Sequence, residues 1–511
     1  MSWNYQVSLE RIQNHLGSLG EIHVEKLVRE AELYALLSET NCRDIYGAHV
    51  YIDVPNFSRL ASEIEGEDYR RVIRAIHLYH REVSRIIERE ELFDGVRIHF
   101  QGPKLHALFF RPIDSSQELA NKAVLLQIVL SHFVANVFNP SFPTLANLSV
   151  AGGAAIGRAI GTKNGVKGDR ELLFLGAPAN HAAKILGRPG QLNLTPEVFA
   201  ALDKKLQRLC TKVSQDKYQV SPIDGQTVTE LTEEFHIKWN PEASARRLDQ
   251  EKLQFPLKDI EYSEAETLID LDGLSIVNNK RVFAASLFAD VSGFTSYIDA
   301  AQSELDKKKA LRVFHAIRKE LAAVVRQDFN GLRIQYQGDR VQALFHLPTD
   351  KKYAIANKAV EAAAGLQSSM ECTLKSCLPE ASSLGLAVGI DLDVTLVSKI
   401  GTRGQRDRIC IGSGVENAAS SQERSNAGEI SITTRTYELL DSTIQRQFKF
   451  DKDRDLYVAA HFHADRIERL ARAAAYSASA PVYVHTSKKN VLVDREGSGG
   501  HQVFPAKSYA E

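Results

Sequence analysis

A chain of 511 residues is long enough for two or three domains, and with 44% hydrophobic and 25% charged residues its composition is that of an ordinary globular protein. With 63 basic and 64 acidic residues the net charge is −1, which excludes a strong electrostatic attraction to nucleic acid. The five cysteines are odd in number and lack metal-ligand spacing, which indicates a reducing compartment.

The N-terminal 45 residues are predicted to form a helical extension, because apolar residues recur at helical spacing between residues 22 and 37. The N-terminus is polar and shows no secretory signal. The most apolar run, 123–138, contains several polar side chains and is too short to cross a bilayer. These features predict a cytoplasmic protein without a membrane span and without a nucleic-acid partner.

The chain contains an internal repeat. The stretch HVYIDVPNFS around Asp53 corresponds to the stretch SLFADVSGFT around Asp290, 237 residues later. The tripeptide QGP that ends at Pro103 corresponds to QGD ending at Asp339, and ANKAV at 120–124 recurs at 356–360, both at an offset of 236 residues. Such an ordered series of matches indicates a duplicated domain.

Each copy of the repeat alternates strand and helix patterns, so we predict an α+β fold in which helices cover a mainly antiparallel sheet in two tandem sandwich domains. The expected boundaries are an extension at 1–45, a first domain at 46–235, a linker at 236–279, a second domain at 280–455 and a tail at 456–511. We expect the last 20 or so residues of the tail to be poorly ordered.

The second copy carries two carboxylates in positions suited to metal binding. Asp290 ends an apolar strand and is followed by a Gly-Phe-Thr turn and a long helical pattern. Asp339 lies at the tip of a predicted hairpin about 50 residues later. Neighbouring strand-end carboxylates can hold the two divalent ions used in phosphoryl transfer, and the free N–H groups of a first helical turn bind phosphate oxygens.

These two motifs resemble those of the class III nucleotidyl cyclases, whose first metal-binding Asp lies in a Phe-x-Asp-x-x-Gly-Phe-Thr strand and whose second follows Gly in such a hairpin. The resemblance covers both copies. It implies two ferredoxin-like cyclase domains that form a pseudo-dimer, within one chain or between the chains of a homo-oligomer. It also implies two Mg²⁺ or Mn²⁺ ions held by Asp290, Asp339 and the backbone carbonyl of Val291.

The same resemblance assigns contacts to the triphosphate. The backbone N–H groups of Gly293, Phe294 and Thr295 would bind its β- and γ-phosphates. Arg403 and Arg406, which lie in a loop just before a strand, are further candidates for phosphate contacts.

In this family the partner domain supplies an Asn that positions the ribose and a basic residue that stabilises charge on the α-phosphoryl group. The first copy matches that segment with Asn180 and Lys184, whereas the second has Glu416 and Ser420 by register. Conversely, the first copy has Pro103 where the second metal-binding Asp belongs. These complementary losses predict one complete composite site and one inactive mirror site.

The residues at the base-reading positions are His99 and Leu173, which are not the pair of a purine cyclase. One polar contact and one apolar wall favour a smaller base, and Tyr297 is expected to fill the pocket or stack in it. With these features the chain most resembles the pyrimidine cyclases of bacterial Pycsar anti-phage systems, which make cyclic CMP or cyclic UMP for a separate effector protein.

The sequence therefore predicts a pyrimidine cyclase that favours CTP over UTP, although the tautomer of the base-reading histidine is left open. Two alternatives are considered. One is an adenylate or guanylate cyclase with unusual base contacts, and the other is a pseudo-cyclase that senses a nucleotide without converting it.

Overall fold

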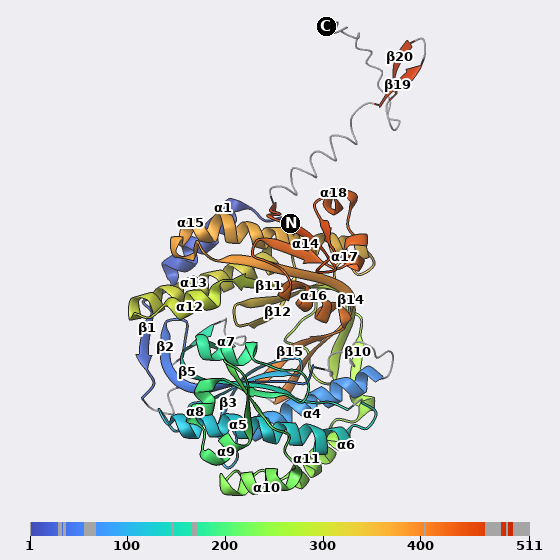
Figure 1. Ribbon diagram of the computed structural model, residues 1–511. Coiled ribbons are helices and arrows are strands. Elements are labelled where there is room, and N and C mark those ends of the chain that lie inside the picture. Colours follow the sequence, from blue (N-terminus) through green and yellow to red (C-terminus); the bar gives the residue numbers. More distant parts are fainter. Residues whose placement is uncertain are drawn as a thin grey trace.

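The computed structural model describes residues 2–28, 33, 37–55, 68–145, 147–164, 171–402, 405–464, 482–486 and 489–493. Two large sheets of equal topology dominate it, one in each half of the chain (Figure 1). The strand order is β3-β4-β2-β5-β7-β9-β8 in the first sheet and β12-β13-β11-β14-β16-β18-β17 in the second. The predicted α+β fold with two tandem domains is thus confirmed, and the two sheets have the same order of strands.

The first half of the chain contains the elements α1 (Tyr5–Ser18), β1 (His23–Lys26), β2 (Asn41–Asp53), α4 (Asp68–Glu88), β3 (Val96–Gln101), β4 (Lys104–Phe109), α5 (Ser116–Phe133), η1 (Val134–Phe138), α6 (Asn139–Ser141), β5 (Ala151–Asn164), β6 (Glu171–Leu175), α7 (Ala177–Lys184), β7 (Leu192–Leu194), α8 (Pro196–Ala201), α9 (Lys204–Arg208), β8 (Cys210–Ser214), β9 (Lys217–Val220) and α10 (Gly225–Glu234). The connection between the halves contains α11 (Pro241–Gln254), η2 (Leu257–Asp259) and β10 (Glu261–Ser263).

The second half repeats this order with β11 (Asn278–Ser292), α12 (Phe294–Ala300), α13 (Glu304–Ala323), η3 (Val324–Asp328), β12 (Leu332–Gln337), β13 (Arg340–Phe345), α14 (Lys352–Ser368), η4 (Ser369–Leu374), α15 (Lys375–Cys377), η5 (Pro379–Ala381), β14 (Gly385–Thr402), β15 (Gln405–Ile411), α16 (Ser413–Glu423), β16 (Glu429–Ile432), α17 (Thr434–Glu438), α18 (Ser442–Gln445), β17 (Lys449–Asp451) and β18 (Leu456–Ala460). A separate two-stranded sheet, β19 (Val482–Thr486) with β20 (Lys489–Val493), follows in the tail.

The two halves exchange hairpins across their seam. The hairpin β5–β6 places Ile160 and Leu173 in the hydrophobic core of the second half. In return, β14–β15 places Leu396 and Ile409 in the core of the first half. Because each core is completed by the other half, the pseudo-dimer forms within a single chain.

Two ion pairs near the tips of these hairpins repeat the pseudo-symmetry. Arg97 of β3 donates to Asp407 of β15 at 2.6 Å, and at the equivalent positions Arg333 of β12 donates to Glu171 of β6 at 2.9 Å. Both arginine side chains are 5% exposed. Partly buried pairs of this kind favour one register between the halves, because shifting the seam would leave charges without partners.

The N-terminal residues differ from the predicted helical extension. Helix α1 ends at Ser18, and His23–Lys26 form a strand that pairs in parallel with β2, which itself begins at Asn41. Of the apolar residues that suggested a helix, Ile22 lies in the core of the second half, and Leu27, Leu33 and Leu37 pack in a cluster with Ile45 of β2, whereas Val28 is exposed. Helix α1 packs on the second half, where Arg11 donates to Glu320 and Asp328.

The segment expected to be a linker and the end of the second domain also differ from the sequence-based boundaries. Helix α11 packs on α4 of the first half, with Arg247 donating to Glu82 at 2.7 Å. Strand β10 then pairs with β11 of the second half. Strand β18, at Leu456–Ala460, belongs to the second sheet, so that sheet extends five residues beyond the predicted limit. Most of the tail lies outside the described residues.

One helical stretch among the described residues, Ser116–Ser141, is long and apolar enough to cross a membrane. The sequence-based run, 123–138, was too short, because α5 already begins at Ser116 and the helical stretch continues to Ser141. Of its most apolar window, 67% is buried inside the protein, in the core under the first sheet. Its apolar composition is therefore explained by packing.

Candidate active site

The first carboxylate stands where the central strand of the second half leaves the sheet. Strand β11 is antiparallel to both β13 and β14. Its residues are buried almost without interruption from Ala284 to Ala289, which is why its sequence is a largely apolar run and does not alternate with polar residues. Asp290 lies near its end. Gly293 has φ +86, a left-handed conformation that favours glycine, and this turn directs the chain into α12. Phe294 then anchors α12 by stacking on Phe314 at a centroid distance of 5.2 Å.

The second carboxylate lies beside the first. The ladder between β11 and β13 ends with the pair Ala289 and Val341, so Asp290 faces the hairpin tip formed by Gly338 and Asp339. Burial raises the pKa of Asp339 well above its usual range, and the Asp290 carboxylate raises it further. Burial also raises the pKa of Asp290, against the opposing influence of Arg340. Two adjacent buried carboxylates repel each other, and a divalent cation between them would relieve that repulsion.

The first half contributes helix α7, which begins after Gly176. This glycine has φ +151, and a Cβ there would lie 3.0 Å from the Arg158 carbonyl oxygen. Asn180 and Lys184 are one turn apart on the helix; Asn180 is half-buried and Lys184 is exposed. Helix α7 packs against α12 of the second half (Figure 1). Nearby His181 and Lys184 of α7 oppose the rise that burial causes in the pKa of the Asp299 carboxyl on α12.

A narrow cavity of about 40 Å³ opens at this seam and brings several of the predicted residues together, although Asp290 and Lys184 are not among the residues that line it. The second half lines it with Asp339, and the first half with Asn180, His99 and Leu173. The other lining residues are mainly apolar or aromatic: Tyr51, Ile98, His106, Phe174, Leu175, Gly176, Ala179, Phe294, Ile298 and Gly338. The metal half and the ribose half of the predicted composite site therefore meet in one place.

Buried rings form the wall of the cavity on the side of the first half. Tyr51 stacks on His106 with the ring centroids 4.3 Å apart and an interplanar angle of 12°. His106 Nε2 lies 3.0 Å from His49 Nδ1, and the His99 ring meets His106 edge-on at 5.4 Å. Burial lowers the pKa of His49 to about 3, and burial with the nearby Arg97 and Arg318 lowers that of His99 to about 3. These imidazoles are therefore neutral hydrogen-bonding groups at neutral pH.

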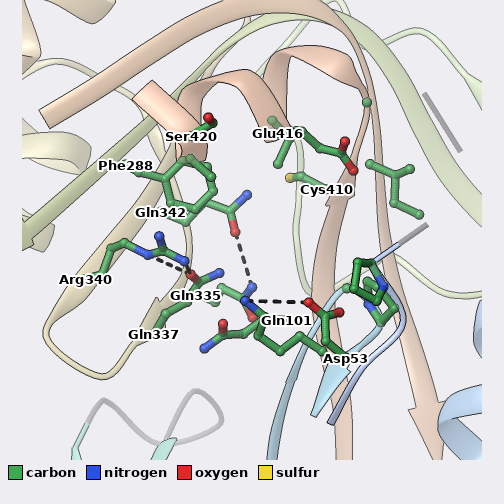
Figure 2. Close-up of a pocket in the computed structure, with 18 of the residues that line it drawn as sticks. Asp53, Gln101, Phe288, Gln335, Gln337, Arg340, Gln342, Cys410, Glu416 and Ser420 are labelled. Carbon is green, nitrogen blue, oxygen red and sulfur yellow. Dashed lines mark hydrogen bonds and ion pairs between the residues drawn. The ribbon is translucent and has the colours of Figure 1, made fainter. Parts of the chain in front are cut away.

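A second cavity, of about 270 Å³, occupies the mirror position of the pseudo-dimer (Figure 2). Asp53 and Pro103 of the first half line it opposite Glu416 and Ser420 of the second. The Lys104 amine lies 3.8 Å from the Asp53 carboxylate. The mirror cavity thus contains a single strand-end carboxylate already beside a cation, and it faces an acidic residue where the other cavity has Asn180.

Several residues predicted for the site lie elsewhere. Tyr297 is half-buried beside Phe294 and under the influence of Glu380 and Asp306, and it does not line the cavity because its ring faces the core of its own half. Arg406 lies on the β14–β15 hairpin, which packs on α4 near His77, and it does not line the seam cavity. The hairpin reaches across the seam into the first half, which the sequence did not reveal. Arg403 lies outside the described residues.

The backbone contacts predicted for the metal and the triphosphate remain predictions. Val291 is buried and continues the ladder with β14, where it pairs with Leu386. Gly293 and Thr295 flank Phe294 at the start of α12, next to the cavity that Phe294 lines.

Tyr51 and His106 were missed by sequence reasoning, although the repeat contained the signal for both. Tyr51 is two residues before Asp53 on β2 and therefore on the same face of the strand. His106 pairs directly with His99 across the hairpin whose tip is at 102–103. Reading the hairpin as paired positions would have placed both histidines together.

Comparisons with known proteins agree with this geometry. Residues 279–469 match the family described as adenylate and guanylate cyclase catalytic domain. The chain is 29% identical over 473 residues to a uridylate cyclase of Pseudomonas aeruginosa, covering 88% of each chain. It is 27% identical over 403 residues to a uridylate cyclase of a Rhizobium species, covering 75% of this chain and 76% of the relative.

Among solved structures, a class III adenylyl cyclase-like ATP-binding protein from Pseudomonas aeruginosa superposes with a TM-score of 0.79 at 25% identity. The match covers 92% of this chain and 99% of that one, so both halves and their arrangement are shared. The resemblance to class III nucleotidyl cyclases, and among them to pyrimidine cyclases, is thereby confirmed over most of the chain.

Proposed function

We propose that this protein is a nucleotidyl cyclase that converts a pyrimidine nucleoside triphosphate to its 3′,5′-cyclic monophosphate and pyrophosphate. The observation that carries the proposal is the seam cavity, in which Asp339 of one half faces Asn180, His99 and Leu173 of the other. Nucleotide cyclisation requires a metal-binding side and a ribose-binding side around one substrate. The mirror cavity lacks both: Pro103 replaces its second metal-binding carboxylate, and Glu416 and Ser420 replace the ribose-binding Asn and the basic residue.

Asp290 and Asp339 are the residues that would hold two Mg²⁺ or Mn²⁺ ions, with the Val291 carbonyl as a further oxygen ligand. The two carboxylates fit this role because burial raises the pKa of both, the Asp290 carboxylate raises the pKa of Asp339 further, and divalent cations would favour the ionised forms. When bound, the ions supply charge neutralisation at the triphosphate and acidify the ribose 3′-hydroxyl. In the described part of the chain no cluster of three or more His, Cys, Asp or Glu side chains offers another metal site.

The chain's own residues would orient the substrate for in-line attack of the 3′-oxygen on the α-phosphorus. Asn180, at the cavity wall, would hold the ribose through its amide. Lys184, exposed one turn further along α7, would extend to the α-phosphoryl group and stabilise its developing charge. The N–H groups of Gly293, Phe294 and Thr295 would bind the β- and γ-phosphates.

The preference for a pyrimidine rests on the shape of the cavity and on the relatives. The stacked rings of Tyr51 and His106 occupy space that a bicyclic base would need, and Leu173 closes the cavity with an apolar wall. The sequence-based preference for CTP over UTP is not supported by the relatives, since both are named uridylate cyclases. We therefore favour UTP.

In the cell, we propose that the cyclic nucleotide is made in the cytoplasm as an anti-phage signal read by a separate effector protein. This part of the proposal rests on the resemblance to the pyrimidine cyclases alone.

A second candidate is an adenylyl cyclase-like or purely ATP-binding protein, favoured by the name of the structure that superposes at TM-score 0.79. Incubating the purified protein with each of UTP, CTP, ATP and GTP in the presence of Mn²⁺ decides between them. We expect a cyclic pyrimidine nucleotide and pyrophosphate, formed at least about tenfold faster than any purine product. ATP conversion at a similar rate would favour a purine cyclase, and binding without conversion of any nucleotide would show a pseudo-cyclase.

A further inference from the structure

The base-reading histidine is held by a neighbour on its own strand. His99 and Gln101 are two residues apart on β3, so their side chains share one face of the sheet. The Gln101 amide nitrogen, Nε2, lies 2.9 Å from Nε2 of His99. An amide nitrogen only donates, so the histidine Nε2 must be the acceptor.

A neutral imidazole that accepts at Nε2 carries its proton on Nδ1. Within the described residues Nδ1 has no hydrogen-bond partner, and the His99 ring lines the cavity. The nitrogen left for a ligand is therefore a donor. Uracil presents an acceptor, O4, at the position where cytosine presents the 4-amino donor.

We propose that Gln101 is a specificity-determining residue, which fixes His99 as a hydrogen-bond donor and thereby selects UTP over CTP. The inference rests on the proposed function, because it needs a pyrimidine in the cavity. Gln101 is a positioning residue in this scheme: it acts on the base only through His99.

The surroundings of the ring keep it neutral, as the tautomer argument requires. The charged groups around His99 are Arg97 on its own strand, Arg318 on α13 and Asp339 across the cavity, and the neutral ring of His106 meets it edge-on. The two guanidinium groups and burial all oppose protonation of His99, whose pKa is lowered to about 3.

The duplicated half shows that the arrangement is particular to this site. Gln335 occupies the position of His99, and Gln337 that of Gln101. The side-chain amide oxygen of Gln337, Oε1, accepts from Arg340 Nε at 2.9 Å. Lys104, which occupies the position of Arg340 in the first half, lies beside Asp53 instead. Gln101 is thus not engaged by the residue that follows its hairpin tip, and it remains available to His99.

The test is the ratio of kcat/KM for UTP to that for CTP, measured in the full chain with Mn²⁺. Gln101→Met removes the donor and lets both tautomers form, so we expect the ratio to fall toward one, by about tenfold or more. Gln101→Glu, assayed at pH 8.5, places an acceptor beside Nε2 and makes Nδ1 an acceptor, so CTP should become the preferred substrate. Gln337→Met, at the equivalent position of the second half, is the matched control: both glutamines line the mirror cavity, but only Gln101 contacts His99, so this variant should keep the wild-type ratio.

Because a ratio of two substrates is independent of the folded fraction, a variant that folds poorly still gives an interpretable result. A wild-type preference for CTP, or a ratio unchanged in both Gln101 variants, would overturn the role of Gln101 while leaving the pyrimidine cyclase intact. Absence of any pyrimidine product in the wild type would instead overturn the proposed function, and this inference with it.

Discussion

The seam cavity and the mirror cavity are built on the same backbone and differ in their side chains. The seam cavity is lined by Asp339, Asn180, His99 and His106, with Lys184 one turn beyond Asn180 on α7. At the equivalent positions the mirror cavity has Pro103, Glu416, Gln335, Gln342 and Ser420. The mirror cavity is also the larger, at about 270 Å³ against about 40 Å³. Space alone therefore does not identify the active site.

Charge separates the two cavities more clearly than volume does. In the mirror cavity the Lys104 amine lies 3.8 Å from Asp53, and Pro103 stands where the other half has its second carboxylate, Asp339. Glu416 adds negative charge that would repel a triphosphate, whereas the Glu423 carboxylate lies 3.5 Å from the Arg340 guanidinium, which lines the same cavity. The pseudo-twofold fold offers two cavities, and a few substitutions leave only one of them suited to a metal-bound nucleotide.

The largest expected contrast concerns the carboxylates. Asp290→Ala or Asp339→Ala should lower cyclase activity by about a thousandfold or more, because each removes a metal ligand. Asp53→Ala, in the mirror cavity, should leave activity nearly unchanged. The activity of each variant is measured as the rate of pyrophosphate release with Mn²⁺, and thermal unfolding checks that each variant remains folded. An equal loss in Asp53→Ala would mean that both cavities are catalytic.

The next contrast lies on helices α7 and α16. Asn180→Ala and Lys184→Ala should each lower kcat by about a hundredfold, since each removes a polar group from the developing transition state. Glu416→Ala and Ser420→Ala are the matched substitutions on α16, and they should be tolerated. Steady-state kinetics for the four variants would distinguish one working site from two.

A smaller effect is expected from the aromatic wall. Tyr51→Ala enlarges the seam cavity, so the preference for a pyrimidine over a purine should weaken by about tenfold. Phe288 occupies the equivalent place in the mirror cavity, and Phe288→Ala should not change the preference. Competition between UTP and ATP, followed by chromatography of the cyclic products, measures the ratio. An unchanged ratio in Tyr51→Ala would show that the Tyr51 ring does not contribute to base selection.

The smallest contrast is in the response to acid. His49 is buried and neutral in the folded protein, with its pKa lowered to about 3, so the unfolded chain binds one more proton below the ordinary histidine pKa. Folding stability should therefore fall as the pH decreases from about 6.5 toward 3. His49→Ser, which copies Ser286 of the second half, should make that fall shallower by up to about 1.4 kcal/mol per pH unit.

Denaturant unfolding at a series of pH values measures the slope. The exposed His23→Ser is the matched control, and its slope should follow that of the wild type. A His49→Ser slope identical to the wild type would mean that this histidine is not held neutral by burial.

The sequence by itself determined the duplication, the fold class and most of the chemistry. Asp339, Asn180, His99 and Leu173 were predicted from motif spacing and register, and they line one cavity, because strand ends and hairpin tips are local features that short patterns specify. The complementary losses at Pro103 and Glu416 could likewise be recognised by aligning the two copies, without any knowledge of their arrangement.

Tertiary structure decided what depends on contacts between distant segments. Because the β14–β15 hairpin crosses the seam and packs on α4, Arg406 does not line the cavity. The Tyr297 ring packs against the core of the second half instead of lining the cavity. The β1–β2 pairing replaced a helix that periodicity had suggested at the N-terminus, because strand pairing with a partner beyond a loop leaves little local signal. The His99 tautomer was also beyond the sequence, since it depends on which amide atom of Gln101 faces the ring, and only packing fixes that orientation.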